Sequence, residues 1–398
     1  MAIFAEMKIT FPSAFDFGTS TASYQIETAF EHDWLGAKSR DGHTFARTTD
    51  HELRYEEDIK IITSLAPNYR MSLMWSKLQR EPYASFDTLA VQQYHALLQG
   101  LRSNGVRIMM VIHHFANPQW FSKSGGWENE KNIPLWCDYA RKLVDEFGEY
   151  VMTWNTFNEP NLYTSLGWIA GEFPPYSKNV FVAYKVIRNI AEAHRQIYAY
   201  IKEKHPKKPV GISHNCTVFA AHNHLGYLPA LVFDWYFMEY TAGLFKDLDF
   251  FGMSYYARVA FDPYPITFME TPHKIKALEK KHDDMWEYYP EGLGENIRRY
   301  WSKLKIPIII TENGICTADD EIRVAALRDY MKEIRQCLDE GIDVRGYYHW
   351  SAWDNFEWSL GPTYQFGLYG CDLETKERTR KGSADVFSRL AYQKEIEI

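Results

Sequence analysis

Two glutamates stand at the ends of short apolar runs that resemble buried strands. Glu159 closes TWNTFNEP, and Glu312 follows the isoleucines of PIIITENG. If both runs are strands of one eight-stranded barrel, three strands apart, the two carboxyl groups would lie about 5–6 Å from each other. Carboxyls at that separation can cleave a glycosidic bond by double displacement, with retention of configuration. The spacing therefore predicts a nucleophile and an acid/base residue.

The residues near the two glutamates predict which of them is the nucleophile and which is the acid/base residue. Arg70 ends another strand-like run, and its guanidinium would favour ionised Glu312, to which the Tyr256 hydroxyl could also donate. Glu159 has no obvious cationic partner and is flanked by apolar side chains, which predicts a raised pKa and a proton available for the leaving oxygen. We therefore expect Glu312 to be the nucleophile and Glu159 the acid/base residue.

The elements that would position these residues alternate between strands and helices along the whole chain. Apolar, β-branched runs predict strands near 15–22, 69–75, 106–114, 151–157, 209–214, 249–256, 306–311 and 344–350. Helical spacing follows each of them, near 55–65, 87–103, 134–149, 180–203, 229–241, 292–304, 320–340 and 384–394. Eight such units predict an α/β fold, a (β/α)₈ TIM barrel that forms a single catalytic domain over residues 1–398.

In such a barrel the loops that follow the strands build the rim of the active site. The longest irregular stretches, near 24–53, 115–132, 160–179 and 257–290, all follow predicted strands. A polar or aromatic residue stands at nearly every strand end: Gln25, Arg70, His114, Asn158, Glu159, Tyr256, Glu312, Asn313 and Trp350. Their shared position predicts that they meet at one barrel mouth.

Composition narrows the possible partners. The formal charge of −8, with lysines and arginines scattered, disfavours nucleic-acid binding, and an aromatic share of 16% suits a site that stacks on half-apolar ligands. No apolar stretch is long enough for a membrane span or a signal peptide, and five widely spaced cysteines indicate free thiols, so we expect a cytoplasmic protein. The adjacent His113 and His114 do not have metal-ligand spacing, and we expect neither metal nor cofactor.

Longer motifs around these residues resemble glycoside hydrolase family 1, the β-glucosidase family. Besides Asn-Glu-Pro and Thr-Glu-Asn-Gly, the chain carries SYQIE (23–27), RYEED (54–58), YRMSLMWSKL (69–78), HHF (113–115), GGW (125–127), DMWEYYPEGL (284–293) and HWSAWDNFEW (349–358). The resemblance implies a β-glucosidase whose substrate is a small β-glycoside or oligosaccharide. It also implies that Trp350 stacks on the sugar in subsite −1, whose hydroxyls would be bound by Gln25, His114, Asn158, Glu357 and Trp358.

Some features depart from that family pattern. Ser254 stands where Asn is usual in an Asn-Tyr-Tyr triplet, Thr28 replaces a usual Gly, and the loop between Glu27 and Arg54 is short. The shorter Ser254 would weaken a hydrogen bond near the acid/base residue. After the last predicted strand, Glu357 and the absence of Lys or Arg before Lys376 favour a neutral sugar over a sugar 6-phosphate.

Other functions fit the same features. A transglycosidase would use the same covalent intermediate, and a non-catalytic sugar-binding barrel would keep the cleft but would be expected to lose a glutamate. A metal-dependent lyase or isomerase on this fold would need ligands that the sequence does not suggest. Preference among glucosides, galactosides and fucosides, the natural aglycone and the oligomeric state are all left open by the sequence.

Overall fold

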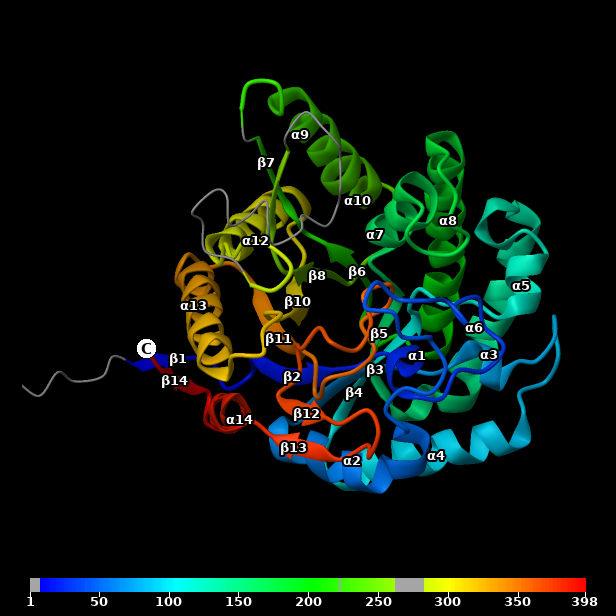
Figure 1. Ribbon diagram of the computed structural model, residues 1–398, viewed down its shortest axis with the longest axis horizontal. Helices are drawn as coiled ribbons and strands as arrows, with labels where there is room; N and C mark the ends of the chain where they lie inside the picture. The colour runs from blue at the N-terminus through cyan, green and yellow to red at the C-terminus, as the bar shows by residue number, and fades with distance from the viewer. Residues whose placement is uncertain (1–7, 222, 262–282) are drawn as a thin grey trace, which may run out of the picture.

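A computed structural model describes residues 8–221, 223–261 and 283–398 and contains a closed barrel of eight parallel strands (Figure 1). Around the barrel the order is β10-β11-β2-β3-β4-β5-β6-β8. Their bounds are β2 (Asp16–Ser20), β3 (Asn68–Ser72), β4 (Arg107–His113), β5 (Val151–Asn158), β6 (Val210–Asn215), β8 (Phe250–Tyr255), β10 (Ile308–Asn313) and β11 (Val344–Trp350). All eight predicted strands are confirmed, and so is the TIM-barrel fold.

The strands are largely buried because helices cover them on the outside and the side chains of the barrel core cover them on the inside. Every residue of β3, β6 and β8 is buried. The ring closes between the last and first strands, where β11 pairs with β2 from Gly346–Asp16 to Trp350–Ser20. This register places Trp350 at the same end of the barrel as the residues that follow the other strands.

Helices surround the barrel, one after each strand (Figure 1). The principal ones are α2 (His51–Leu65), α4 (Thr88–Ser103), α6 (Ile133–Phe147), α8 (Val180–Lys204), α9 (Tyr227–Phe233), α12 (Glu291–Leu304), α13 (Asp320–Asp339) and α14 (Gly382–Gln393). Side-chain caps fix several starts, as where Asp87 accepts from the Ala90 amide at 3.0 Å. The helix predicted near 229–241 is interrupted, since a π-helical segment, η5 (Asp234–Tyr240), separates α9 from α10 (Thr241–Gly243).

Shorter elements occupy the loops and the ends of the chain. The short helices are α1 (Ser23–Ile26), α3 (Trp75–Leu78), α5 (Gln119–Lys123), η1 (Gly126–Glu128), η2 (Glu130–Asn132), η3 (Gly148–Tyr150), α7 (Pro160–Ser165) and η4 (Leu166–Ala170). Three strand pairs lie outside the barrel: β1 (Lys8–Thr10) with β14 (Glu395–Glu397), β7 (Val218–Ala221) with β9 (Arg258–Phe261), and β12 (Tyr369–Cys371) with β13 (Arg378–Arg380). None of these pairs was predicted.

Two of the stretches predicted to form irregular rim loops begin with regular structure. The stretch predicted as irregular at 257–290 begins with β9, and its residues 262–282 lie outside the described part of the chain. The stretch at 160–179 begins instead with helical turns, α7 and η4. Among the described residues, no helix is both long and apolar enough to cross a membrane.

Candidate active site

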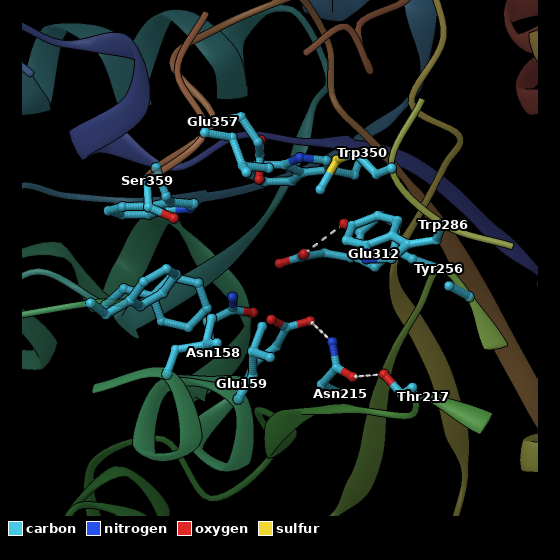
Figure 2. A pocket seen from close by; sticks show the side chains of 18 of the residues that line it. Asn158, Glu159, Asn215, Thr217, Tyr256, Trp286, Glu312, Trp350, Glu357 and Ser359 are labelled. Carbon is cyan, nitrogen blue, oxygen red and sulfur yellow. Dashed lines mark hydrogen bonds between the residues drawn. The ribbon is translucent and has the colours of Figure 1, made fainter. Parts of the chain in front are cut away.

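The two glutamates line one pocket at the barrel mouth, which contains about 880 Å³ of empty space. Glu159 directly follows β5, and Glu312 lies near the end of β10, three steps away round the ring through β6 and β8. Figure 2 shows their carboxyl groups on facing sides of the pocket. Glu159 has a left-handed backbone conformation, with φ of 39°, at the turn from strand into α7.

The Glu312 carboxylate is held by a cation and a hydroxyl. Arg70 Nη1 donates to its Oε1 at 2.6 Å, and the Tyr256 hydroxyl donates to its Oε2 at 2.9 Å. Arg70 is fully buried, so its charge is poorly screened by solvent. Its second terminal nitrogen donates to Asn158 Oδ1 at 2.6 Å. Oε1 of Glu312 therefore contacts a buried guanidinium, and hydrogen bonds fix the positions of both carboxylate oxygens.

Glu159 has a different environment. It is buried, and its pKa is raised to about 8, first by burial and then by the negative charge of Glu312. Asn215 Nδ2 donates to its Oε1 at 3.0 Å, and the Thr217 hydroxyl in turn donates to Asn215 Oδ1 at 2.7 Å (Figure 2). At neutral pH this carboxyl carries a proton. Asn215 and Thr217 were not predicted as site residues, although Asn215 ends β6 just as other site residues end their strands.

Ser254, on β8, lies between the strands that carry Asn215 and Glu312. In the barrel register it is opposite Asn215 on β6 and Glu312 on β10. The Ser254 hydroxyl is near enough to the Glu159 carboxyl to lower the pKa of Glu159, against the larger effect of burial. The hydroxyl itself is buried and makes no hydrogen bond of ordinary geometry with any described residue. The hydrogen bond to Glu159 thus comes from Asn215, on the neighbouring strand.

A second group of polar residues faces the opposite side of the pocket. Gln25 Nε2 donates to Glu357 Oε2 at 3.1 Å and to Asn355 Oδ1 at 2.9 Å. Burial, followed by the charge of Glu312, raises the pKa of Glu357 to about 7. Gln25 Oε1 is buried without a partner among the described residues. A buried acceptor beside a pocket is well placed for a ligand hydroxyl.

His114 and Asn158 form a bridge from this group to Arg70. Because Asn158 Oδ1 accepts from Arg70, its amide nitrogen must be the atom that donates to His114 Nε2, at 3.0 Å. The pKa of His114 is lowered well below its usual value by burial and then by Arg70, so the ring is neutral with its proton on Nδ1. That nitrogen has no partner among the described residues and can donate to a ligand.

Two tryptophans complete the walls. Trp350, at the end of β11, and Trp358 both line the pocket and both lie 5.9 Å from the His114 ring, centroid to centroid. Indole faces of this kind suit the C–H surface of a pyranose. Of the described residues that line the pocket, none is Lys or Arg. The structure thus brings together ten of the eleven residues that the sequence placed at the barrel mouth, with Arg70 and Gln25 behind the lining side chains. The eleventh, Asn313, does not line the pocket: its Nδ2 donates to the Tyr255 carbonyl at 2.6 Å, and its Oδ1 accepts from the Tyr347 hydroxyl at 2.9 Å.

Comparisons with known proteins agree with this site. The sequence model of glycosyl hydrolase family 1 matches residues 7–224 and 237–396. Beta-glucosidase A of Thermotoga maritima is 27% identical over 97% of this chain and 99% of its own. A beta-galactosidase of Pyrococcus woesei is 28% identical over 84% of each chain.

Solved structures give the same result. A beta-glycosidase from Pyrococcus horikoshii aligns with a TM-score of 0.85 at 30% identity, over 98% of this chain and 97% of that one. A beta-glucosidase from Thermotoga maritima in complex with deoxynojirimycin aligns with a TM-score of 0.87 at 25% identity, over 97% and 99%. Since the family match spans almost the entire barrel and both glutamates stand in its mouth, the chain belongs to glycosyl hydrolase family 1 and is a glycosidase.

Proposed function

We propose that this glycosidase is a retaining β-glucosidase that removes a neutral, non-reducing terminal β-D-glucosyl group through a covalent glycosyl-enzyme. The observation that carries the proposal is the contrast between the two glutamates. Glu312 has a buried guanidinium at 2.6 Å, whereas Glu159 is a buried acid with a pKa of about 8. Such a contrast assigns one carboxyl as nucleophile and the other as proton donor.

In the first step, Glu312 attacks the anomeric carbon while Glu159 gives its proton to the departing glycosidic oxygen. The C–O bond to the aglycone breaks as the ester bond to Glu312 forms. Arg70 and Tyr256 orient the nucleophile. In the second step, Glu159 takes a proton from water, the hydroxide attacks the same carbon, and Glu312 leaves, so configuration is retained.

The remaining named residues would bind the sugar. Gln25 offers its free Oε1 and Glu357 its carboxyl oxygens to vicinal hydroxyls, and His114 Nδ1 has a proton to donate to a third. Trp350 would stack on the ring. A neutral glycone is supported by the buried Glu357 carboxyl and by the lack of Lys or Arg among the described lining residues, because a phosphate there would be repelled and uncompensated. The homologues act on related sugars: one is named a beta-glucosidase, another a beta-galactosidase.

Azide rescue tests the assignment. We expect Glu312→Gly to lose hydrolysis by several orders of magnitude, and Glu159→Ala to retain activity on aryl β-glucosides with activated leaving groups. Added azide should give the β-glycosyl azide from Glu159→Ala, whereas any rescue of Glu312→Gly should give the α-glycosyl azide. A matched control is Glu203→Ala, an exposed glutamate on α8, which should behave as the native protein. An α-azide from Glu159→Ala, or β-azide from the Glu312 variant, would reverse the two roles.

A further inference from the structure

The pocket has two chemically different sides. Except for Asn158, which ends β5, the polar residues assigned to the sugar follow β2, β4 and β11. The wall beyond Glu159, where the leaving group must lie, comes from the loops after β5, β6 and β8. That second wall is built from Leu162, Leu166, Phe237, Val259, Met285 and Trp286. In Figure 2, Trp286 lies beside Tyr256, and their ring centroids are 5.6 Å apart. Among the described residues, the aglycone therefore meets mostly aliphatic and aromatic side chains.

Two polar side chains of this wall, Asn215 and Thr217, use part of their hydrogen-bonding capacity within the protein. Asn215 Nδ2 donates to Glu159, and the Thr217 hydroxyl donates to Asn215 Oδ1 (Figure 2). Among the described lining residues of the three loops, no charged side chain remains for an aglycone hydroxyl. A second sugar in this position would find few partners among the described lining residues for the hydrogen bonds that its hydroxyls make in water, which disfavours it.

From this division we infer that the preferred substrates are β-glucosides of alkyl alcohols, with a flexible hydrocarbon chain as the aglycone. The inference rests on the proposed function and adds the substrate class. An alkyl chain can follow a wall in which Leu162, Leu166, Val259 and Met285 come from two different loops, and it carries no hydroxyl that needs a partner. Because burial of apolar surface scales with chain length, affinity should rise with each methylene group that enters the pocket.

The test compares initial rates on methyl, butyl, hexyl and octyl β-D-glucosides, kept below their micelle concentrations, with those on cellobiose. We expect kcat/KM to rise roughly two- to fourfold per added methylene until the chain leaves the pocket. Octyl glucoside should exceed cellobiose at least about a hundredfold. The comparison is stringent, because the sugar hydroxyl is the more acidic leaving group and intrinsic reactivity favours cellobiose.

A variant locates the effect in the wall. Leu162→Asn, on α7, should lower the octyl-to-methyl ratio of kcat/KM at least about fivefold, whereas Leu89→Asn, 71% exposed on α4, should leave that ratio unchanged. If Leu162→Asn does not fold, the nearly isosteric Val259→Thr, on β9 in the same wall, should lower the same ratio.

The outcomes separate the two proposals. Rates that do not depend on chain length, or cellobiose hydrolysis equal to that of octyl glucoside, would overturn the alkyl preference while leaving the β-glucosidase proposal intact. A strong preference for aryl glucosides over alkyl glucosides of equal size would also overturn it. No hydrolysis of any β-glucoside, including an activated aryl glucoside, would instead refute the proposed function.

Discussion

Replacing Glu159 by Gln tests how strongly the pocket opposes a second negative charge. The substitution keeps the shape of the side chain, and its Oε1 can still accept from Asn215. In the folded chain the pKa of Glu159 is about 8, whereas its ordinary value is 4.5. Folded protein therefore binds the proton more tightly than unfolded protein. As pH rises between these values, Glu159 ionises in the unfolded chain but stays protonated in the folded one, so stability is lost.

The size of the effect follows from the same numbers. The full difference in pKa would lower the free energy of unfolding by about 5 kcal/mol above pH 8. Water in the open pocket reduces this loss to about 2–5 kcal/mol. For a chain of 398 residues, an unfolding entropy of about 0.8 kcal/mol per kelvin converts this into a Tm difference of roughly 2–6 °C. Gln cannot ionise, so the variant should escape this loss entirely.

We expect the Tm of Glu159→Gln minus that of the native protein to increase by this amount between pH 4.5 and pH 9. Scanning calorimetry or near-UV circular dichroism at one scan rate measures it, and any pH-independent effect of the substitution cancels. Glu203→Gln, at an exposed position on α8, is the control and should show a constant difference. A constant difference for Glu159→Gln as well would mean that Glu159 is ionised at neutral pH, which removes the basis for its role as acid.

Two further predictions concern departures within the site. Ser254→Asn should fold and should either leave kcat/KM on a simple aryl glucoside unchanged or raise it, by at most about 1 kcal/mol of transition-state stabilisation. The reason is that the present hydroxyl makes no hydrogen bond of ordinary geometry with a described residue. A hundredfold drop in a well-folded variant would show that Ser254 has a role of its own. An aryl β-glucoside should be hydrolysed with a kcat/KM at least about a thousandfold above that of its 6-phosphate, roughly 4 kcal/mol, and comparable rates would mean that a cation reaches the pocket.

The sequence predicted the barrel because short β-branched or aromatic segments alternate regularly with helical spacing, although strands such as β2 and β3 also carry polar residues. It predicted which residues meet, because strand ends converge in such a barrel. It did not predict the hydrogen bond from Asn215 to Glu159, which depends on side-chain direction. The break in the helix near 229–241 and the pairing of β7 with β9 depend on tertiary packing between distant segments.

The difference between the two glutamates arises from the barrel and not from their local sequences. Each glutamate is next to an asparagine at a strand end, and neither motif contains a cation. Arg70 on β3 donates directly to Glu312, but it reaches the β5 side only through Asn158, whose amide then turns to His114. Burial and the charge of Glu312 outweigh the effect of Arg70 on the pKa of Glu159. A single buried guanidinium, placed nearer to Glu312 than to Glu159, therefore distinguishes two carboxyls with similar local sequences, and this difference supports the roles proposed for them.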